Sequence, residues 1–179
     1  LQSVEPSIDL TMPPADDVRM GVFICQCGHF ISEIVDTEAI RELAMTWPTV
    51  IHAEVLPFSC TPEAQAAIQK KVQELGLNRI TLGACACCSL DQICYSCTYQ
   101  RVRCKTNLGM FGFRQNNTKP GGDLRGGYLQ PSAVEFVNIR EQCAWAHRED
   151  PKAATAKAMA LISAAVAKNQ TAAGKLLEY

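Results

Sequence analysis

Short apolar runs alternate with helix signals along the first half of the chain, and this alternation limits the possible folds more than any other feature. The runs RMGVFI at 19–24, TVIHAEVL at 49–56 and RITLGA at 79–84 are apolar and have the length of buried strands. A helix is expected between successive strands, and a strand–helix–strand unit places its two strands in parallel. The sequence therefore predicts an α/β fold with an open parallel sheet.

Local signals mark the ends of the two helices in this alternation. Asp36 is a favourable N-cap for a helix over 37–47, which a proline then ends. Thr61 caps a second helix over 62–75 that has proline at its first position, and Gly76 stands where such a helix terminates.

The second half of the chain is less regular. The run AVEFVNI at 133–139 is a fourth strand candidate, and an Ala-rich helix is expected over 151–168. A serine and a glutamine with capping-box spacing predict a cysteine-rich helix over 90–107. The segment 109–132 is dense in Gly, Pro and Asn and is expected to form a long loop insertion. The expected fold is a Rossmann-like open sheet of about four parallel strands flanked by helices, with a Cys-rich helix and a Gly-rich excursion.

Composition indicates one domain. The 179 residues are 47% hydrophobic and 20% charged, enough for one ordinary core over 18–168. Segments 1–17 and 169–179 are expected to be linkers to other domains of a larger protein. A net charge of −1 gives no field that favours nucleic acid, and no run reaches the roughly 18 apolar residues of a membrane span. No secretory leader opens the chain, so a soluble cytoplasmic protein is expected, with neither nucleic acid nor membrane as partner.

The chain contains ten cysteines, and half of them follow predicted strands. In a reducing cytosol such a set indicates metal, cluster or redox chemistry rather than disulfides. The carboxyl ends of parallel strands share one edge, where ligands of such sheets bind. Five thiols are therefore expected to converge as candidate metal ligands: Cys25, Cys27, Cys60, Cys85 and Cys143.

Several chemistries remain open for these thiols. Iron–sulfur clusters take thiolates almost exclusively, whereas structural zinc takes four cysteines or a mixture with histidine. Cys60 precedes a helix N-terminus, which favours the thiolate form that binds metal. Free cysteine is also a common small core residue, so any one of the five has a purely structural alternative.

The other candidate residues form two groups. Five cysteines follow the third strand and are expected to form a second site, a redox dithiol or a thiol-rich wall: Cys87, Cys88, Cys94, Cys97 and Cys104. His29, Arg140 and His147 are candidate site-lining residues, although a solvated salt bridge with Glu141 is the alternative for Arg140. His52, inside the second strand, is expected to be structural.

Four motifs resemble the N-terminal domain found in the family of the heterodisulfide reductase A subunit: GVFICQCG, FSC, GAC and FVNIREQCAWAHRED. By position, the five cysteines that follow the strands match the family's cysteines. The resemblance implies an iron–sulfur cluster of the [4Fe-4S] type, or two of them, and an electron-transfer role in anaerobic metabolism. It also implies FAD/NAD(P)-binding and ferredoxin-like domains or subunits of the same oxidoreductase as partners.

The flavin is expected on another domain or subunit, because CQCGHF stands where a Rossmann GxGxxG fingerprint would follow the first strand. The leading hypothesis is therefore a non-catalytic, cluster-binding electron-transfer domain of a larger flavin-dependent oxidoreductase. The alternatives are a zinc-stabilised docking module and a dithiol–disulfide relay that uses Cys94 and Cys97.

Overall fold

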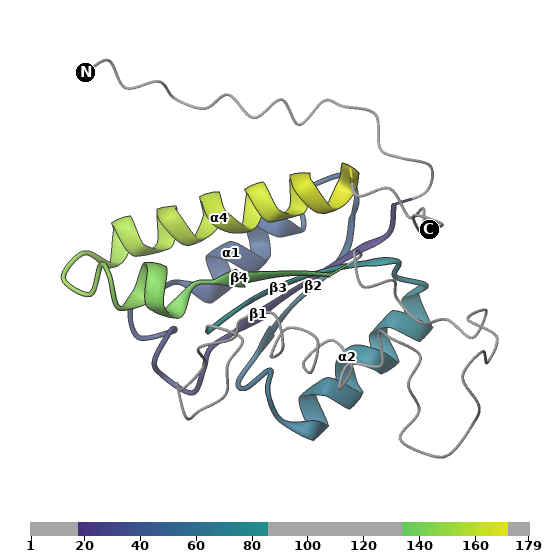
Figure 1. Cartoon of the computed structure of the whole chain (residues 1–179), viewed down its shortest axis with the longest axis horizontal. Helices are drawn as coiled ribbons and strands as arrows, with labels where there is room; N and C mark the ends of the chain where they lie inside the picture. The colour runs from purple at the N-terminus through teal and green to yellow at the C-terminus, as the bar shows by residue number, and fades with distance from the viewer. Residues whose placement is uncertain (1–17, 86–133, 172–179) are drawn as a thin grey trace, which may run out of the picture.

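The computed structural model describes residues 18–85 and 134–171. Within these ranges, four strands form one sheet in the order β2-β1-β3-β4, and every neighbouring pair is parallel (Figure 1). The strands are β1 (Met20–Cys25), β2 (Val50–Leu56), β3 (Arg79–Ala84) and β4 (Val134–Asn138). The open parallel sheet predicted from the sequence is thus confirmed. The expected cysteine-rich helix and the Gly-rich excursion lie outside the described residues.

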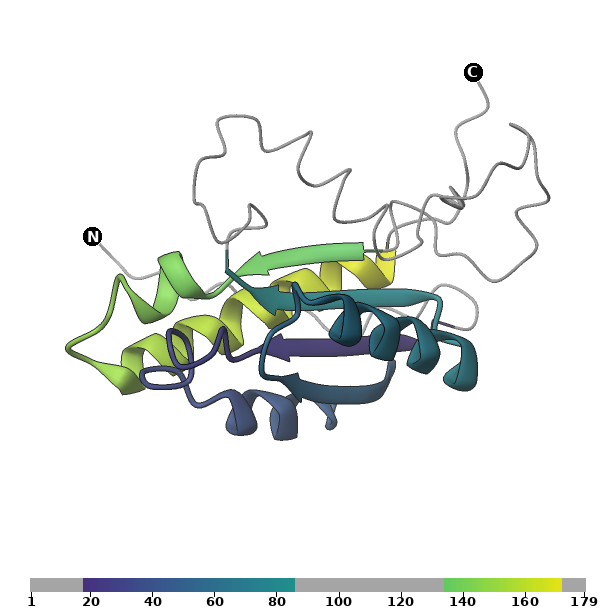
Figure 2. The ribbon, with the colours of Figure 1, turned by 90° about the horizontal axis from the view of Figure 1, so that it is seen from below.

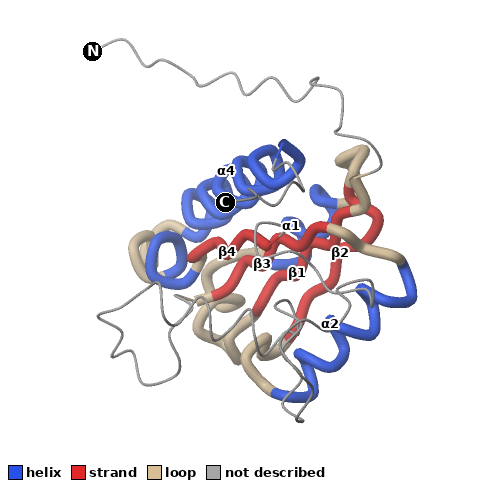
Figure 3. Tube along the Cα trace, turned by 45° about the vertical axis from the view of Figure 1, so that its right-hand side comes forward, coloured by secondary structure: helices blue, strands red, loops and turns tan. Residues whose placement is uncertain are grey.

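Helices cover both faces of the sheet. Figure 2 shows α2 (Pro62–Leu75) against one face, and α4 (Pro151–Thr171) against the other together with α1 (Thr37–Ala44). A short π-helix, η2 (Arg140–Ala144), follows β4 directly, and the sequence patterns predict no element there. Seen from another side in Figure 3, the strands lie between these helical layers.

The helix starts follow the predicted caps. The Asp36 carboxylate accepts a hydrogen bond from Ala39 N at 2.9 Å, and the Thr61 hydroxyl accepts one from Ala64 N at 3.2 Å. Gly76 closes α2 in the left-handed conformation with φ 59°, which glycine adopts at little cost. These caps satisfy backbone groups that would otherwise lack partners at the helix ends.

Two helix ends differ from the sequence-based expectation. The first helix is expected to reach residue 47 but ends at Ala44, where i to i+3 hydrogen bonds such as Thr46 N to Leu43 O tighten the chain. The last helix is expected to end at 168 but continues to Thr171. There the buried Asn169 donates from Nδ2 to Ile80 O at 2.8 Å, which holds the final turn against β3.

The core lies on both sides of β1 and β3. All six residues of β1 are buried, and Phe23 and Ile24 have no exposed surface. On α4 a stripe at four-residue spacing faces the sheet and is buried: Ala154, Ala158, Ile162 and Val166. This packed sheet fixes the positions of the loops at its carboxyl edge.

Among the described residues, no helix is both long and apolar enough to span a bilayer.

Candidate metal centre

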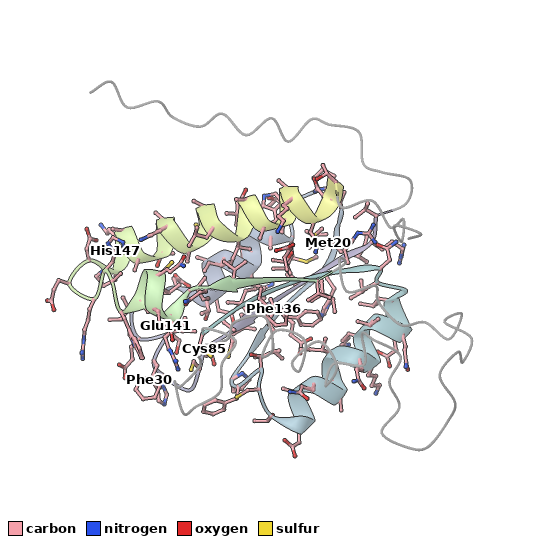
Figure 4. The ribbon with its side chains drawn as sticks, in the orientation of Figure 1. Met20, Phe30, Cys85, Phe136, Glu141 and His147 are labelled. Carbon is pink, nitrogen blue, oxygen red and sulfur yellow. The ribbon has the colours of Figure 1, made fainter. Side chains whose placement is uncertain are left out.

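Segments from all four strands meet at the carboxyl edge of the sheet. The strand ends are in register, because Cys25 pairs with Leu56, Ile24 with Gly83, and Ala84 with Asn138. Figure 4 shows Cys85, Glu141 and Phe30 at this end of the sheet and Met20 at the opposite end. Residues far apart in sequence are thus brought to one edge, as the sequence analysis predicted.

Cys25 ends β1 with its sulfur held by two backbone N–H groups. Its Sγ accepts hydrogen bonds from Cys27 N at 3.2 Å and from Ser59 N at 3.3 Å, and its side chain is buried. The loops that supply these donors are joined to each other, because Gln26 N donates to Leu56 O and Gly28 N donates to Pro57 O. Hydrogen bonds of this kind stabilise a sulfur that carries negative charge.

The chain turns sharply at Cys27. Cys27 has φ 52° and the following Gly28 has φ 65°, so two consecutive residues occupy the left-handed region. That conformation is unusual for a non-glycine residue and is a form of backbone strain that clusters at functional sites. The turn buries the Cys27 side chain, whose Sγ accepts a hydrogen bond from Arg140 Nη1 at 3.2 Å.

Gly28→Ala is expected to destabilise the chain by more than Gly76→Ala does. A Cβ at either position pays the left-handed penalty of about 1–2 kcal/mol. At Gly28 the added atom would also lie 3.0 Å from the Phe58 ring, whereas at Gly76 its nearest neighbour is 3.6 Å away. Urea unfolding of both variants measures the difference. Equal losses would show that Phe58 does not restrict the turn, and Phe58→Ala should relieve only the Gly28 variant.

Cys60 and Cys85 complete a group of four thiols. Cys60 is exposed in the loop after β2, and Cys85 is half-buried directly after β3. Burial is the main cause that raises both thiol pKa values, that of Cys85 to about 12, and the charges of Cys25 and Cys27 raise them further. The positive charge of Arg140 lowers both pKa values. The four thiols and one cation therefore lie close enough to interact.

The thiolate expected at Cys60 from its position before α2 is not favoured in the free chain. Partial burial outweighs the backbone hydrogen bond that lowers the Cys60 pKa, so the net shift is upward. The N-cap of α2 is occupied by Thr61, whose hydroxyl accepts the hydrogen bond from Ala64 N. Binding a metal at these thiols would therefore release protons.

Arg140 is a buried cation with three kinds of partner. Its side chain is only 4% exposed, and Nε and Nη2 donate to Glu141 Oε1 at 3.0 and 2.7 Å. Nη1 donates to Cys27 Sγ, and the guanidinium carbon lies 4.6 Å from the centre of the Trp145 ring. The salt bridge with Glu141 considered from the sequence is therefore present, but its arginine is buried rather than solvated. Nothing in the local sequence predicts this burial, because Cys27 is distant in the chain.

Cys143 lies in η2 and is fully buried. Burial raises its thiol pKa, and the charge that opposes this shift belongs to Lys157 of α4. The Lys157 ammonium also lies 3.2 Å from His147 Nε2, and Figure 4 shows His147 in the loop between η2 and α4. These interactions connect Cys143 and His147 to α4 rather than to the four-thiol group.

The remaining sequence-predicted residues are only partly placed. His29 is exposed in the turn after Cys27, and His52 contacts Glu54 at 2.9 Å within β2. Within 18–85 and 134–171, no three His, Cys, Asp or Glu side chains already form a group able to hold a metal ion. The second group of candidates falls outside the described residues: Cys87, Cys88, Cys94, Cys97 and Cys104.

The four-thiol group nevertheless has the chemistry that an iron–sulfur cluster requires. Its donors are all sulfur, and iron–sulfur clusters are held by four cysteine thiolates. The backbone N–H groups on Cys25 and the guanidinium on Cys27 are the outer hydrogen bonds that orient ligands and tune such a centre. In the type of donor atom, the residues present therefore fit the group that the sequence motifs imply.

Curated relatives were found by sequence comparison, whereas no protein-family model matches the chain. The A subunit of a heterodisulfide,ferredoxin reductase from Methanothermobacter thermautotrophicus is 34% identical over 86% of this chain. The first of the iron-sulfur A subunits of heterodisulfide reductase in Methanopyrus kandleri is 37% identical over 87%, and its counterpart in Methanocaldococcus jannaschii is 35% identical over 83%. The match covers only 19% of each of these relatives. The chain is therefore a homologue of one part of the heterodisulfide reductase A subunit.

Proposed function

We propose that the chain is the iron–sulfur electron-transfer domain of a larger oxidoreductase. The observation that carries the proposal is that Cys25, Cys27, Cys60 and Cys85 all lie at the carboxyl edge of the sheet, where a buried guanidinium donates to the Cys27 sulfur. These four thiols are the proposed ligands, one for each iron of a [4Fe-4S] cluster. Two of the relatives described above are named iron-sulfur subunits, which supports an iron–sulfur centre of this kind.

Cys143 is not included in the proposed ligand set. Its charged neighbour is Lys157, whereas Cys60 and Cys85 both interact with Cys25, Cys27 and Arg140. Its complete burial in η2 beneath α4 favours a role as a small core residue. Four cysteines are sufficient for one cluster, so the fifth is not required.

The rest of the electron path is assigned to other parts of the oxidoreductase. At the carboxyl edge, the sequence CQCGHF starts at the end of β1. It lacks the GxGxxG glycine pattern that binds dinucleotides. FAD or NAD(P) and ferredoxin-like modules are therefore proposed on further domains or subunits. Two relatives are named as A subunits of heterodisulfide reductases that also involve ferredoxin, which supports redox partners of the ferredoxin type.

A reversible redox titration tests the proposed function. The 179-residue chain is reconstituted without oxygen with iron and sulfide, and its visible absorbance is followed during reduction by dithionite and reoxidation. A cluster that transfers electrons is expected to lose and regain absorbance over repeated cycles. A colourless zinc-loaded chain would support the docking-module alternative. A coloured chain that is not reduced would contradict an electron-transfer role.

A further inference from the structure

We propose that Arg140 sets the reduction potential of the cluster held by the four thiols, by keeping a fixed positive charge against the Cys27 sulfur. This inference rests on the proposed function and assigns to one residue the control of that site. Arg140 would not bind the metal itself but would act on the cluster through the Cys27 sulfur.

The first step of the argument is that the guanidinium is held in one orientation. Nε and Nη2 both donate to Glu141 Oε1, which leaves Nη1 directed at Cys27 Sγ. Trp145 lies across the guanidinium face at 4.6 Å. Glu141 is itself anchored, because its backbone N donates to Asn138 Oδ1 at 3.0 Å at the end of β4.

The second step is that the charge on Arg140 is permanent and poorly screened. A guanidinium stays protonated under all conditions that a protein tolerates, so electron transfer leaves its proton in place. With 4% of the side chain exposed, water and salt screen it far less than a surface charge. Glu141 offsets part of this charge, but the guanidinium N–H is the group that contacts sulfur.

The third step concerns the sign of the effect. A one-electron donor adds one negative charge to the cluster, and no bond to Arg140 is made or broken. A nearby cation and a hydrogen bond to a ligand sulfur stabilise the form with more negative charge, which raises the reduction potential. Arg140 is therefore expected to raise the potential, and Glu141 to lower it.

Three variants at the site and one distant control test this assignment. Arg140→Gln removes the charge but keeps an amide donor. Glu141→Gln removes the carboxylate charge but keeps a side-chain oxygen that accepts from Nε and Nη2, so the guanidinium stays directed at Cys27. Arg79→Gln removes a partly buried arginine from the opposite end of β3, where its Nε donates to Asn169 O at 3.3 Å. Arg140→Lys keeps a charge but loses the planar fork that contacts Cys27 and Glu141 together.

The measurement is the midpoint potential of each anaerobically reconstituted 179-residue chain, with iron content determined on the same samples. We expect a lower midpoint in R140Q, a smaller decrease in R140K, a higher midpoint in E141Q and no shift in R79Q. An R140Q chain with full iron and an unshifted midpoint would overturn the inference. If the R140Q chain does not hold iron, the midpoint potential of the E141Q chain is the deciding measurement. An unshifted or lowered midpoint in E141Q would then overturn the inference. Failure of the unmodified chain to bind iron would instead contradict the proposed function.

Discussion

Cys60→Ser is expected to keep the fold and lose most of the iron bound after anaerobic reconstitution. Cys60 is exposed and outside the core, so the substitution should change the free energy of unfolding by no more than about 0.5 kcal/mol. The same change removes one proposed ligand, and serine is a poor substitute because clusters are held by thiolates. Iron and acid-labile sulfide per chain, with circular dichroism for the fold, measure the two effects separately.

The matched control for this prediction is Cys143→Ala. It removes a thiol from the same edge of the sheet, but one that lies in η2, which packs on α4, and whose pKa is affected by the Lys157 charge. We expect this variant to retain iron at the level of the unmodified chain. A folded Cys143→Ala chain without iron would place Cys143 among the ligands, and a fully loaded Cys60→Ser chain would remove Cys60 from them.

Phe23→Ala is expected to reduce the free energy of unfolding by about 3–5 kcal/mol. Phe23 lies in the middle of β1 with no exposed surface, and its ring centre is 5.8 Å from that of His52 on the neighbouring strand. The substitution leaves a cavity between β1 and its surroundings that a sheet paired on both sides cannot close. Urea unfolding followed by circular dichroism and extrapolated to water measures the loss.

Phe30→Ala is the control for the core prediction. It deletes the same atoms from a ring that is 64% exposed, so a change within about 0.5 kcal/mol is expected. Comparable losses in the two variants would mean that Phe30 is covered in the folded chain. A loss below about 1 kcal/mol for Phe23→Ala would show that the centre of the sheet repacks.

The strands and caps were predictable because each depends on a local pattern. The apolar composition of RITLGA alone predicts strand bounds of 79–84, and the structure confirms them. Residue type and spacing predict Asp36 and Thr61 as N-caps, and both accept the expected backbone hydrogen bond. Local chemistry of this kind is visible in a single sequence.

The electrostatic features of the site were not predictable in this way. The burial of Arg140 depends on Cys27, which is 113 residues earlier in the chain, and on a π-helix that the sequence pattern does not predict. The left-handed conformation of Cys27 is not predicted by its residue type; it occurs between Gln26 and Gly28, whose backbone N–H groups donate to the end of β2 and the loop after it. The helix end predicts a lowered Cys60 pKa, but desolvation raises it. Each of these effects requires tertiary contacts.

The most direct test of the central claim is the metal content of the 179-residue chain after anaerobic reconstitution. Iron, acid-labile sulfide and zinc are measured per chain together with the visible spectrum. The account predicts about four irons with matching sulfide and a brown chromophore, and about eight irons would add a second cluster. Zinc without iron, or no metal at all under these conditions, would contradict it.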